Sequence, residues 1–534
     1  MDRKLLRRLV MLLIVSLLAL GLAACSTKEV DQEVDNDGKE ANQPGTEVDE
    51  EAEFKSLVIG YEMDYESLDH IRTANYSDAL ILMLDRLVSR DYDFTYQPGL
   101  AKEWKISDDS LTWTFYLKEG VTFHDGKPFT ADDVKWTFDQ ILDPDVGSPA
   151  AGDFSPIKEV NVIDEYTVDL VLEHAFPNLL FVISATVAGI GSQEAYEEYG
   201  DEYGSNYVIG TGPYKFKEWV RGDKIVLEIN PDYEWGPDWA VDASIDEIVM
   251  RTIPEETSRI MEIEAGNVHI LRDTSATIIE RLRDSDTVDI HDGDAPRLGY
   301  LAYATDKEPF TDVRVRRAIN HAINKEEIVE YIFRDNATVA HGYLPPMLTD
   351  EYYQGSEAAG YEYSKEKAIQ LLEEAGYGDG LTLKLSAENN SEMTQFAQVI
   401  QNQLGEVGIE VEIQLYDSSS YVAMLREGEQ ELFLRVYNWL NADILDWFLE
   451  SSQFPFPNHS RWIDDKTDEL IATARSASSW EERAVGYHEV QKHLIEQAVW
   501  TPVYHPTRSV AVRKDVMNFK FHPWQTQFQE LDLE

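Results

Sequence analysis

The chain has 534 residues, enough for about three ordinary domains or one large multi-lobed body. Its 100 acidic residues against 46 basic ones give a formal charge of −54, which repels nucleic-acid phosphates, so we expect no nucleic-acid partner. With 43% hydrophobic and 11% aromatic residues the chain can build a large core, which excludes wholesale disorder. The single cysteine, Cys25, permits no disulfide within the chain.

Residues 1–24 have the features of a secretory signal peptide. Basic residues precede an uncharged, largely apolar run over 9–22, which spans only about 21 Å as a helix and so argues against a permanent membrane anchor. The sequence Leu22-Ala23-Ala24-Cys25 resembles a bacterial lipobox. This resemblance implies cleavage before Cys25 and lipidation of that residue, whereas an ordinary cleaved signal or a short anchor are the alternatives.

Residues 25–53 are predicted to be a lipidated cysteine followed by an acidic, disordered tether. Eleven of the 28 residues over 26–53 are acidic and none is aromatic, so this segment cannot bury a core. A flexible chain of this length has a reach of about 30 Å, enough to hold a body just off a membrane. All 59 aromatic residues lie at or after Phe54, where we expect the folded body to begin.

The body shows both helical and strand patterns. Apolar spacing predicts a helix opened by Thr130, two consecutive helices over 311–333 with Asn324 and Glu327 as a capping box, and a helix over 392–406. Alternating or β-rich runs predict strands, namely 111–117, 225–229, 381–385 and 409–415. The strand, helix, strand order after residue 381 predicts a parallel pair, and the fold class is α/β with mixed sheets.

The motifs of common enzymes are missing from the sequence. We find no H-E-x-x-H, C-x-x-C, G-x-S-x-G or P-loop pattern, and the twelve histidines show no metal-ligand spacing. Among so many acids a close carboxylate pair arises by chance, so an extracellular glycoside hydrolase is only a weak alternative. We therefore predict no catalytic residue, no metal site and no cofactor.

Several long blocks together resemble one family of transport proteins. They are residues 104–117 (WKISDDSLTWTFYL), 120–134 (GVTFHDGKPFTADDV), 210–214 (GTGPY), 309–319 (PFTDVRVRRAI) and 372–377 (LEEAGY). The chain resembles the extracellular solute-binding proteins of the peptide/nickel type, and the resemblance covers nearly all of residues 54–534. It implies a two-lobed, periplasmic-binding-protein-like α/β clamshell with mixed sheets, a discontinuous first lobe and an extra subdomain, which delivers a ligand to an ABC-type importer.

The same resemblance predicts how the chain divides into lobes. The first lobe takes 54–86, then an extra subdomain over 87–205, then 206–305; the second lobe takes 306–505, and 506–534 returns to the first. Hinges are expected near 300–308 and 500–508, where the chain passes between the proposed lobes.

The predicted ligand site lies in a segment that resembles the family's cleft-lining strand. The first aspartate of Asp443-Ile-Leu-Asp446 matches the residue that receives the α-ammonium group in peptide-binding members, and a carboxylate is the natural partner for a desolvated ammonium. The alternative is that Asp443 merely caps a helix over 444–450. Beside Trp439, Asn438 and Leu440 match positions whose backbone pairs with an extended peptide.

Weaker matches complete the predicted site. Asn75 and Tyr76 fall near the corresponding strip of the first lobe, although exposed loop positions would explain them equally well. Arg435 is the candidate cation for a peptide carboxylate, unless it pairs with a neighbouring acid. Residues 389–396 contain neither the arginine of dipeptide-binding members nor the histidine of oligopeptide-binding members, which argues against strict dipeptide selectivity.

The sequence thus predicts a monomeric, substrate-binding lipoprotein that captures short peptides with a free amino terminus. Its partners are the peptide, the permease subunits of an ABC transporter and, through the lipid on Cys25, the membrane. We expect it on the outer face of a Gram-positive cytoplasmic membrane, or on the periplasmic side of that membrane in a Gram-negative bacterium, with its acidity suited to a saline or alkaline medium. A nickel or metal-chelate binding subunit of the same transporter class is the alternative function.

Overall fold

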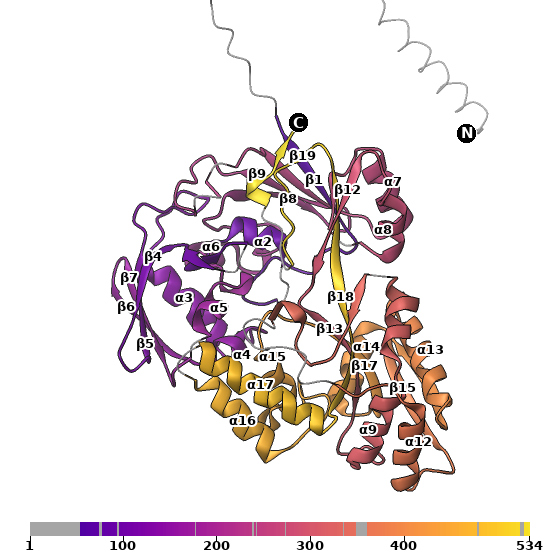
Figure 1. Cartoon of the computed structure of the whole chain (residues 1–534). Coiled ribbons are helices and arrows are strands. Elements are labelled where there is room, and N and C mark those ends of the chain that lie inside the picture. The colour runs from indigo at the N-terminus through magenta and orange to yellow at the C-terminus, as the bar shows by residue number, and fades with distance from the viewer. Residues whose placement is uncertain are drawn as a thin grey trace, which may run out of the picture. The chain divides into compact units, whose positions relative to one another are not determined.

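The long strand β18 (Trp500–Arg513) joins the two halves of a 12-stranded mixed sheet in the computed structural model of the chain (Figure 1). Residues 54–534 form one compact unit. The structure describes these residues apart from 74–76, 93–94, 177, 238–239, 242, 273, 335, 349–359, 478–479 and 524–527. The predictions for the signal peptide, Cys25 and the tether, and those for Asn75 and Tyr76, lie outside the described residues.

The first half of the sheet surrounds β1 (Ser56–Tyr61), which is central and buried. Parallel neighbours β10 (Glu247–Thr252) and β11 (Ile270–Leu271) flank β1, and the antiparallel strands β9 (Lys224–Ile229) and β8 (Tyr214–Val220) continue from β10. Strand β1 is apolar along its length because both of its faces are covered. The remaining elements of this half are α2 (Asp78–Met83), α7 (Glu256–Glu264), α8 (Ala276–Leu282), β12 (Val288–Asp294), β19 (Val516–Met517), η6 (Phe528–Glu530) and β20 (Asp532–Leu533).

The second half contains the predicted crossover. Strands β15 (Leu381–Glu388) and β16 (Ile409–Tyr416) are parallel, and α13 (Ser391–Gly405) connects them, which confirms the predicted strand, helix, strand unit. Strand β17 (Leu432–Asn438) lies beside β15 and pairs with β13 (Arg297–Tyr303). The other elements are α9 (Val313–Ala322), α10 (Lys325–Ile328), η3 (Val329–Phe333), β14 (Ala337–Val339), η4 (Pro346–Leu348), α12 (Lys365–Glu374) and α14 (Ser418–Glu427).

A separate four-stranded antiparallel sheet forms a small-sheet unit with its own core. Its strand order is β4 (Ala101–Ile106), β5 (Thr112–Leu117), β7 (Thr167–Leu172) and β6 (Ile157–Asp164). Phe115 on β5 and Phe138 on α3 are buried together in one cluster. The unit also contains β2 (Val88–Arg90), β3 (Tyr96–Pro98), α3 (Ala131–Leu142), α4 (Ala151–Phe154), α5 (Leu179–Ile183), η1 (Thr186–Ala188), α6 (Gln193–Tyr199) and η2 (Gly200–Glu202).

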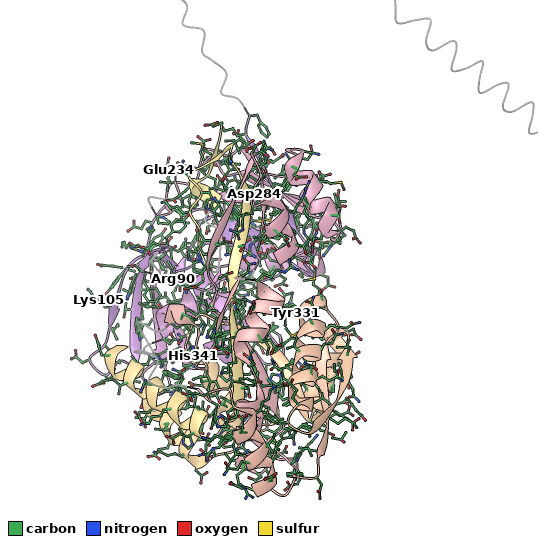
Figure 2. All side chains as sticks on the ribbon, turned by 45° about the vertical axis from the view of Figure 1, so that its right-hand side comes forward. Arg90, Lys105, Glu234, Asp284, Tyr331 and His341 are labelled. Atoms are coloured by element: carbon green, nitrogen blue, oxygen red, sulfur yellow. The ribbon has the colours of Figure 1, made fainter. Side chains whose placement is uncertain are left out.

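The chain passes between the two halves of the large sheet at two places. Residues Trp500–Tyr504 of β18 pair with β13, whereas Thr507–Arg513 pair with β12, so this strand crosses near residues 504–507. The connection from β12 to β13 covers only residues 295–296, earlier than the predicted hinge at 300–308. Figure 2, turned by 45°, shows β18 as one continuous strand along this crossing. The fold is the expected two-lobed α/β clamshell with mixed sheets.

Three helices of the second lobe approach the small-sheet unit. They are α15 (Ile444–Leu449), α16 (Asp465–Arg475) and α17 (Trp480–Glu496). Helix α15 is the first helix after β17, and the short η5 (Ser451–Gln453) follows it. In Figure 1, α16 and α17 lie below α4 and α5. Trp462, between η5 and α16, is buried in the same core cluster as Phe433 and Tyr437 of β17. The approach of these helices to α4 and α5 defines the candidate site.

Candidate functional site

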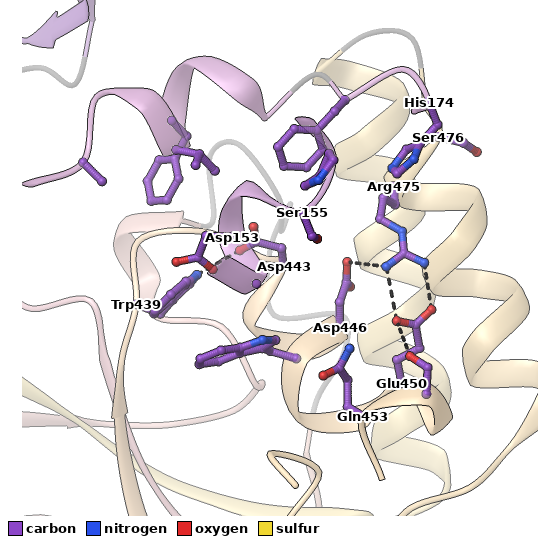
Figure 3. Close-up of a pocket in the computed structure, with 18 of the residues that line it drawn as sticks. Asp153, Ser155, His174, Trp439, Asp443, Asp446, Glu450, Gln453, Arg475 and Ser476 are labelled. Atoms are coloured by element: carbon purple, nitrogen blue, oxygen red, sulfur yellow. Dashed lines mark hydrogen bonds and ion pairs between the residues drawn. The ribbon is translucent and has the colours of Figure 1, made fainter. Parts of the chain in front are cut away.

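A pocket of about 690 Å³ lies between the small-sheet unit and the helices of the second lobe (Figure 3). One wall comes from α4, α5 and η1, with the apolar side chains Phe176, Phe181 and Val182. The opposite wall comes from residues 439–476, including Trp439 and Trp447. The volume is in the range of small-molecule and peptide sites, and the walls combine aromatic side chains with many charged and polar ones.

Asp443 occupies the N-cap position of α15, but its side chain makes no capping hydrogen bond. Its Oδ1 instead accepts a hydrogen bond from Nε1 of Trp439 at 2.9 Å, and its Oδ2 accepts one from Nδ2 of Asn178 at 2.8 Å. The carboxylate therefore faces the pocket rather than the first turn of its helix. A helix cap would accept a hydrogen bond from the first turn of α15, and the Asp443 side chain accepts none there. Capping alone therefore does not explain the position of this side chain.

Two asparagines hold Asp443 in this orientation. Asn178 is fully buried at the start of α5, and its carbonyl oxygen accepts a hydrogen bond from Nδ2 of Asn441. Oδ1 of Asn441 in turn accepts from the backbone N–H of Asp443 at 3.3 Å. A buried, fully bonded network of this kind fixes its members, so the Asp443 carboxylate is preorganised across the gap between the two walls.

Burial disfavours the charged form of Asp443, and three neighbouring groups favour it. Burial raises the pKa of Asp443, whereas Arg483 and the hydrogen bonds from Trp439 and Asn178 lower it. Arg483 is fully buried, with its guanidinium 4.9 Å from the centre of the Tyr487 ring. Three compensating groups on one carboxylate indicate a position that is built to hold negative charge inside the protein.

Asp446 and Arg475 lie farther along the same wall. Burial and the nearby charge of Asp443 raise the pKa of Asp446 to about 8, although Arg475 lowers it. The Tyr487 hydroxyl lies 2.9 Å from each carboxyl oxygen of Asp446. Arg475 is engaged by Glu450, with Nη2 to Oε1 at 2.7 Å and Nη1 to Oε2 at 3.2 Å, so its charge is already balanced.

Asp153 brings a further carboxylate into the pocket from the opposite wall. It lies on α4, and Figure 3 shows it beside Asp443 and Trp439. Burial, followed by the negative charge of Asp443, raises the pKa of Asp153 to about 7. The pocket thus collects acidic groups from both walls, which makes it a receptor for positive charge.

Only part of the predicted site lies in this pocket. Trp439 and Asp443 line it, and Trp439 stacks on Trp447 with ring centroids 5.6 Å apart. Arg435 lies on β17 opposite Tyr300 of β13, and its charge opposes the effect of burial on the pKa of that tyrosine. Asn438 is exposed at the end of β17, paired with Arg297, and Leu440 is buried. None of these three lines the pocket, and their roles toward a ligand stay predictions.

Sequence reasoning missed Asp153, Asn178 and Arg475, each from a different part of the chain. No motif surrounds Asp153, which is one acid among 100. Asn178 reads as an ordinary residue at a helix start. The sequence gives no signal for these three residues. The only further pocket residue that it indicates is Asp446, because the spacing of Asp443-Ile-Leu-Asp446 places that aspartate one turn along the same helix.

Comparison with known proteins identifies the family. The model of the bacterial extracellular solute-binding proteins, family 5 middle region, matches residues 95–454. The chain is 31% identical over 477 residues to di/tripeptide-binding protein 2 of Pseudomonas aeruginosa, covering 82% of this chain and 87% of that protein. The chain therefore belongs to the family 5 extracellular solute-binding proteins, as its sequence blocks predicted.

Solved structures share the fold over most of the body. The binding protein DppA of Helicobacter pylori, in complex with the peptide STSA, superposes with a TM-score of 0.78 at 26% identity, covering 90% of this chain and 98% of that one. NikZ of Campylobacter jejuni, in complex with Ni(L-His), superposes with a TM-score of 0.78 at 23% identity, covering 89% of this chain and 99% of that one. The second likeness concerns the fold alone.

The described residues lack the features of two other classes of site. No helix among them is both long and apolar enough to cross a membrane. Within the same residues, no group of three or more histidine, cysteine, aspartate or glutamate side chains is arranged to hold a metal ion.

Proposed function

We propose that this chain is the substrate-binding lipoprotein of an ABC importer and that it captures short peptides with a free amino terminus in the pocket beside Asp443. The observation that carries the proposal is the orientation of Asp443. Its carboxylate faces the pocket, away from its own helix, and is held there by donors from Trp439 and Asn178. Each oxygen keeps acceptor capacity for a further donor.

The chemistry of the pocket fits the amino-terminal end of a peptide. An ammonium group that leaves water needs an anionic partner, and a charge-assisted hydrogen bond to Asp443 provides it. The stacked rings of Trp439 and Trp447 offer an apolar surface for the first side chain. The peptide-binding relatives named above support the choice of ligand.

Backbone recognition is the second part of this proposal. We place Asn438 and Leu440 beside the extended peptide, as predicted from the sequence, with Arg435 toward its carboxylate and Asn75 and Tyr76 on the other side. Among the described residues β15 pairs only with Leu432 and Phe433 of β17, which leaves the same edge of β17 open to a further strand toward Asn438. Binding through backbone groups tolerates many side chains, so the ligand set is broad.

We further propose that the protein acts by binding alone, as a monomer, on the outer face of a Gram-positive cytoplasmic membrane. There the permease subunits of the transporter receive the peptide. Cys25 carries the lipid anchor and 26–53 form the tether. A Cys25→Ala protein should lose the lipid from its intact mass and escape from the membrane fraction. A variant that is processed and retained like the native protein would overturn the anchor.

The lobe boundaries are also a proposal. The change of partners of β18 near 504–507 supports a division at residue 505, and we keep the predicted divisions at 86 and 205. We place the other division at 295–296 instead of 305, since β13 pairs along its whole length with β17 and with the first part of β18.

A double cycle tests the ligand assignment. Deleting one member of a buried charge pair costs about 3–5 kcal/mol, so Asp443→Ala should weaken binding of a free peptide by roughly 10² to 10³-fold. Acetylating the amino terminus should weaken binding to the native protein by a similar factor. Because both changes remove the same contact, their effects should not add.

Calorimetric titration with a tripeptide and its N-acetyl form measures all four corners of this cycle. Additive losses, or equal affinity of the native protein for both peptides, would show that Asp443 does not bind the ammonium. Tight binding of a nickel chelate in that case would favour the metal-chelate alternative, and turnover of a sugar would favour the hydrolase.

A further inference from the structure

The side chain of Asp153 lines the pocket and makes no hydrogen bond or ion pair with the described residues. Its backbone N–H closes a turn with Ala150. The side chain is half-buried on α4, in the wall opposite α15. Burying a carboxylate without a hydrogen-bond donor costs free energy. We take this as an indication that a ligand supplies the missing donor.

The charged groups around Asp153 do not supply that donor. Arg475 forms an ion pair with Glu450 and lies 4.0 Å from Asp446. Arg483 acts on Asp443, where its positive charge lowers the pKa of that carboxyl group. The groups that face the pocket or support its walls are Asp443, Asp446, Glu450, Arg475 and His174, with Arg483 and Tyr487 behind them. Asp443 and Glu450 offset the charges of Arg483 and Arg475, and Asp446 keeps its proton near neutral pH, so no positive charge is left over for Asp153.

The protonation of Asp153 responds to this environment. Burial and the charge of Asp443 raise its pKa to about 7, so near neutral pH the carboxyl group carries a proton in a large share of molecules. A cation placed between Asp153 and Asp443 would oppose the effect of both causes on this pKa. It would stabilise the charged form of Asp153 and expel the proton.

We propose that Asp153 is a second acceptor for the ammonium group bound by Asp443, so that the amino terminus of the peptide bridges the two walls and binding releases a proton from Asp153. This inference rests on the proposed function. It assigns a specificity-determining residue to the small-sheet unit, whereas the family resemblance gave Asp443 as the only acceptor for the ammonium group. It also gives the ligand a direct means of holding the two walls together.

The proposal predicts how affinity depends on pH. The protein that is ready to bind carries an ionised Asp153, so affinity should rise with pH up to about 7 and fall again above about pH 8, where the amino group of the peptide loses its proton. If the bound cation keeps Asp153 ionised at all pH values used, affinity should rise by about 16-fold at most between about pH 5.5 and pH 7. The acetylated peptide should show a much weaker slope, because it carries no cation.

Isothermal titration of the full chain with trialanine and with Lys-Ala-Ala tests this role. Asp153→Asn should weaken binding of both peptides by about 10-fold at pH 8 and remove most of the pH dependence. The native protein should show different apparent enthalpies in phosphate and in Tris at pH 7, because a released proton is taken up by the buffer. The variant should not. Glu159→Gln, at an exposed carboxylate on β6 outside the pocket, is the matched control and should behave like the native protein.

Three other results would contradict the role of Asp153 or the proposed function. Native affinity and native pH slope in Asp153→Asn would show that Asp153 is a bystander. A loss confined to Lys-Ala-Ala would show that Asp153 binds a side chain and not the amino terminus. If the native protein binds neither peptide, the proposed function itself fails, and with it this role of Asp153.

Discussion

The carboxyl group of Asp446 shows how a residue inside the pocket ties stability to pH. Its folded pKa of about 8 lies above the ordinary value of 3.8, since burial and Asp443 disfavour its charge. The folded state therefore binds more protons than the unfolded state between these values. This contribution is fully favourable below about pH 4 and is lost as pH rises toward about 8, by up to about 1.4 kcal/mol per pH unit.

Replacing Asp446 by Asn should flatten that dependence. The amide keeps a hydrogen-bond partner for Tyr487 but cannot ionise. Urea denaturation at several pH values from about 5 to 8 should show the free energy of unfolding falling less steeply in Asp446→Asn than in the native protein. Asp446→Ala removes the carboxyl group that lies 2.9 Å from the Tyr487 hydroxyl and should cost about 1–3 kcal/mol. Equal slopes in native protein and Asn variant would contradict this reading of Asp446.

At the same scale, sequence reasoning located one wall of the pocket and not the other. Asp443 and Trp439 stand in a recognisable segment, and both line the pocket. Asp153 and Asn178 are brought to the same place only by the packing of the small-sheet unit against the second lobe. No local pattern encodes such a meeting, because it depends on contacts between residues separated by hundreds of positions.

Among the elements, β13 depends on a glycine. Gly299 lies opposite Tyr504 of β18, and a Cβ at this position would overlap the tyrosine ring. The ring is held in place because its hydroxyl donates to Oε1 of Glu392 at 2.7 Å. The close approach of β13 and β18 next to the lobe crossing therefore requires a residue without a side chain.

Gly299→Ala should lower the free energy of unfolding by about 1–3 kcal/mol, the usual cost of overpacking a core. The matched control is Gly405→Ala in α13, where a Cβ would meet nothing within 4 Å. Alanine favours the helix, so this control should be neutral or more stable by up to about 1 kcal/mol. Urea denaturation measures both variants. Native stability in Gly299→Ala would show that Tyr504 moves aside at no cost.

Elements with strong local patterns were predictable from sequence. The helices around residues 313–333 and the parallel pair of β15 and β16 appear where periodicity placed them. Finer details were not. Asn324 caps α10 by accepting from the N–H of Glu327, but its own N–H donates to Gln403 and not to Glu327. Half of the expected capping box is thus replaced by a contact with α13, which no local rule anticipates.

Across the whole molecule, two crossings connect the lobes, at 295–296 and near 504–507. Few connections allow one lobe to rotate against the other, as in other hinged binding proteins. We expect a saturating free peptide to reduce the radius of gyration in small-angle X-ray scattering, and the N-acetyl peptide at the same concentration to leave it unchanged. Superimposable profiles with and without bound peptide would contradict hinge closure.

The net charge of −54 sets a second property of the whole molecule. Repulsion among the acids opposes the compact state, and salt screens it, because the Debye length falls from about 30 Å at 0.01 M to about 3 Å at 1 M. The melting temperature should therefore rise across this range of sodium chloride. Potassium chloride should give the same gain at equal ionic strength. A melting temperature independent of salt would show that the charge is locally balanced.

The central claim is that the amino terminus of a peptide lies between Asp443 and the opposite wall of the pocket. A crystal structure of the protein with a bound tripeptide measures this directly. The account predicts the peptide nitrogen within about 2.7–3.2 Å of a carboxylate oxygen of Asp443, with the first side chain against Trp439 or Trp447. A peptide bound elsewhere, or bound with its carboxylate end toward Asp443, would contradict the account.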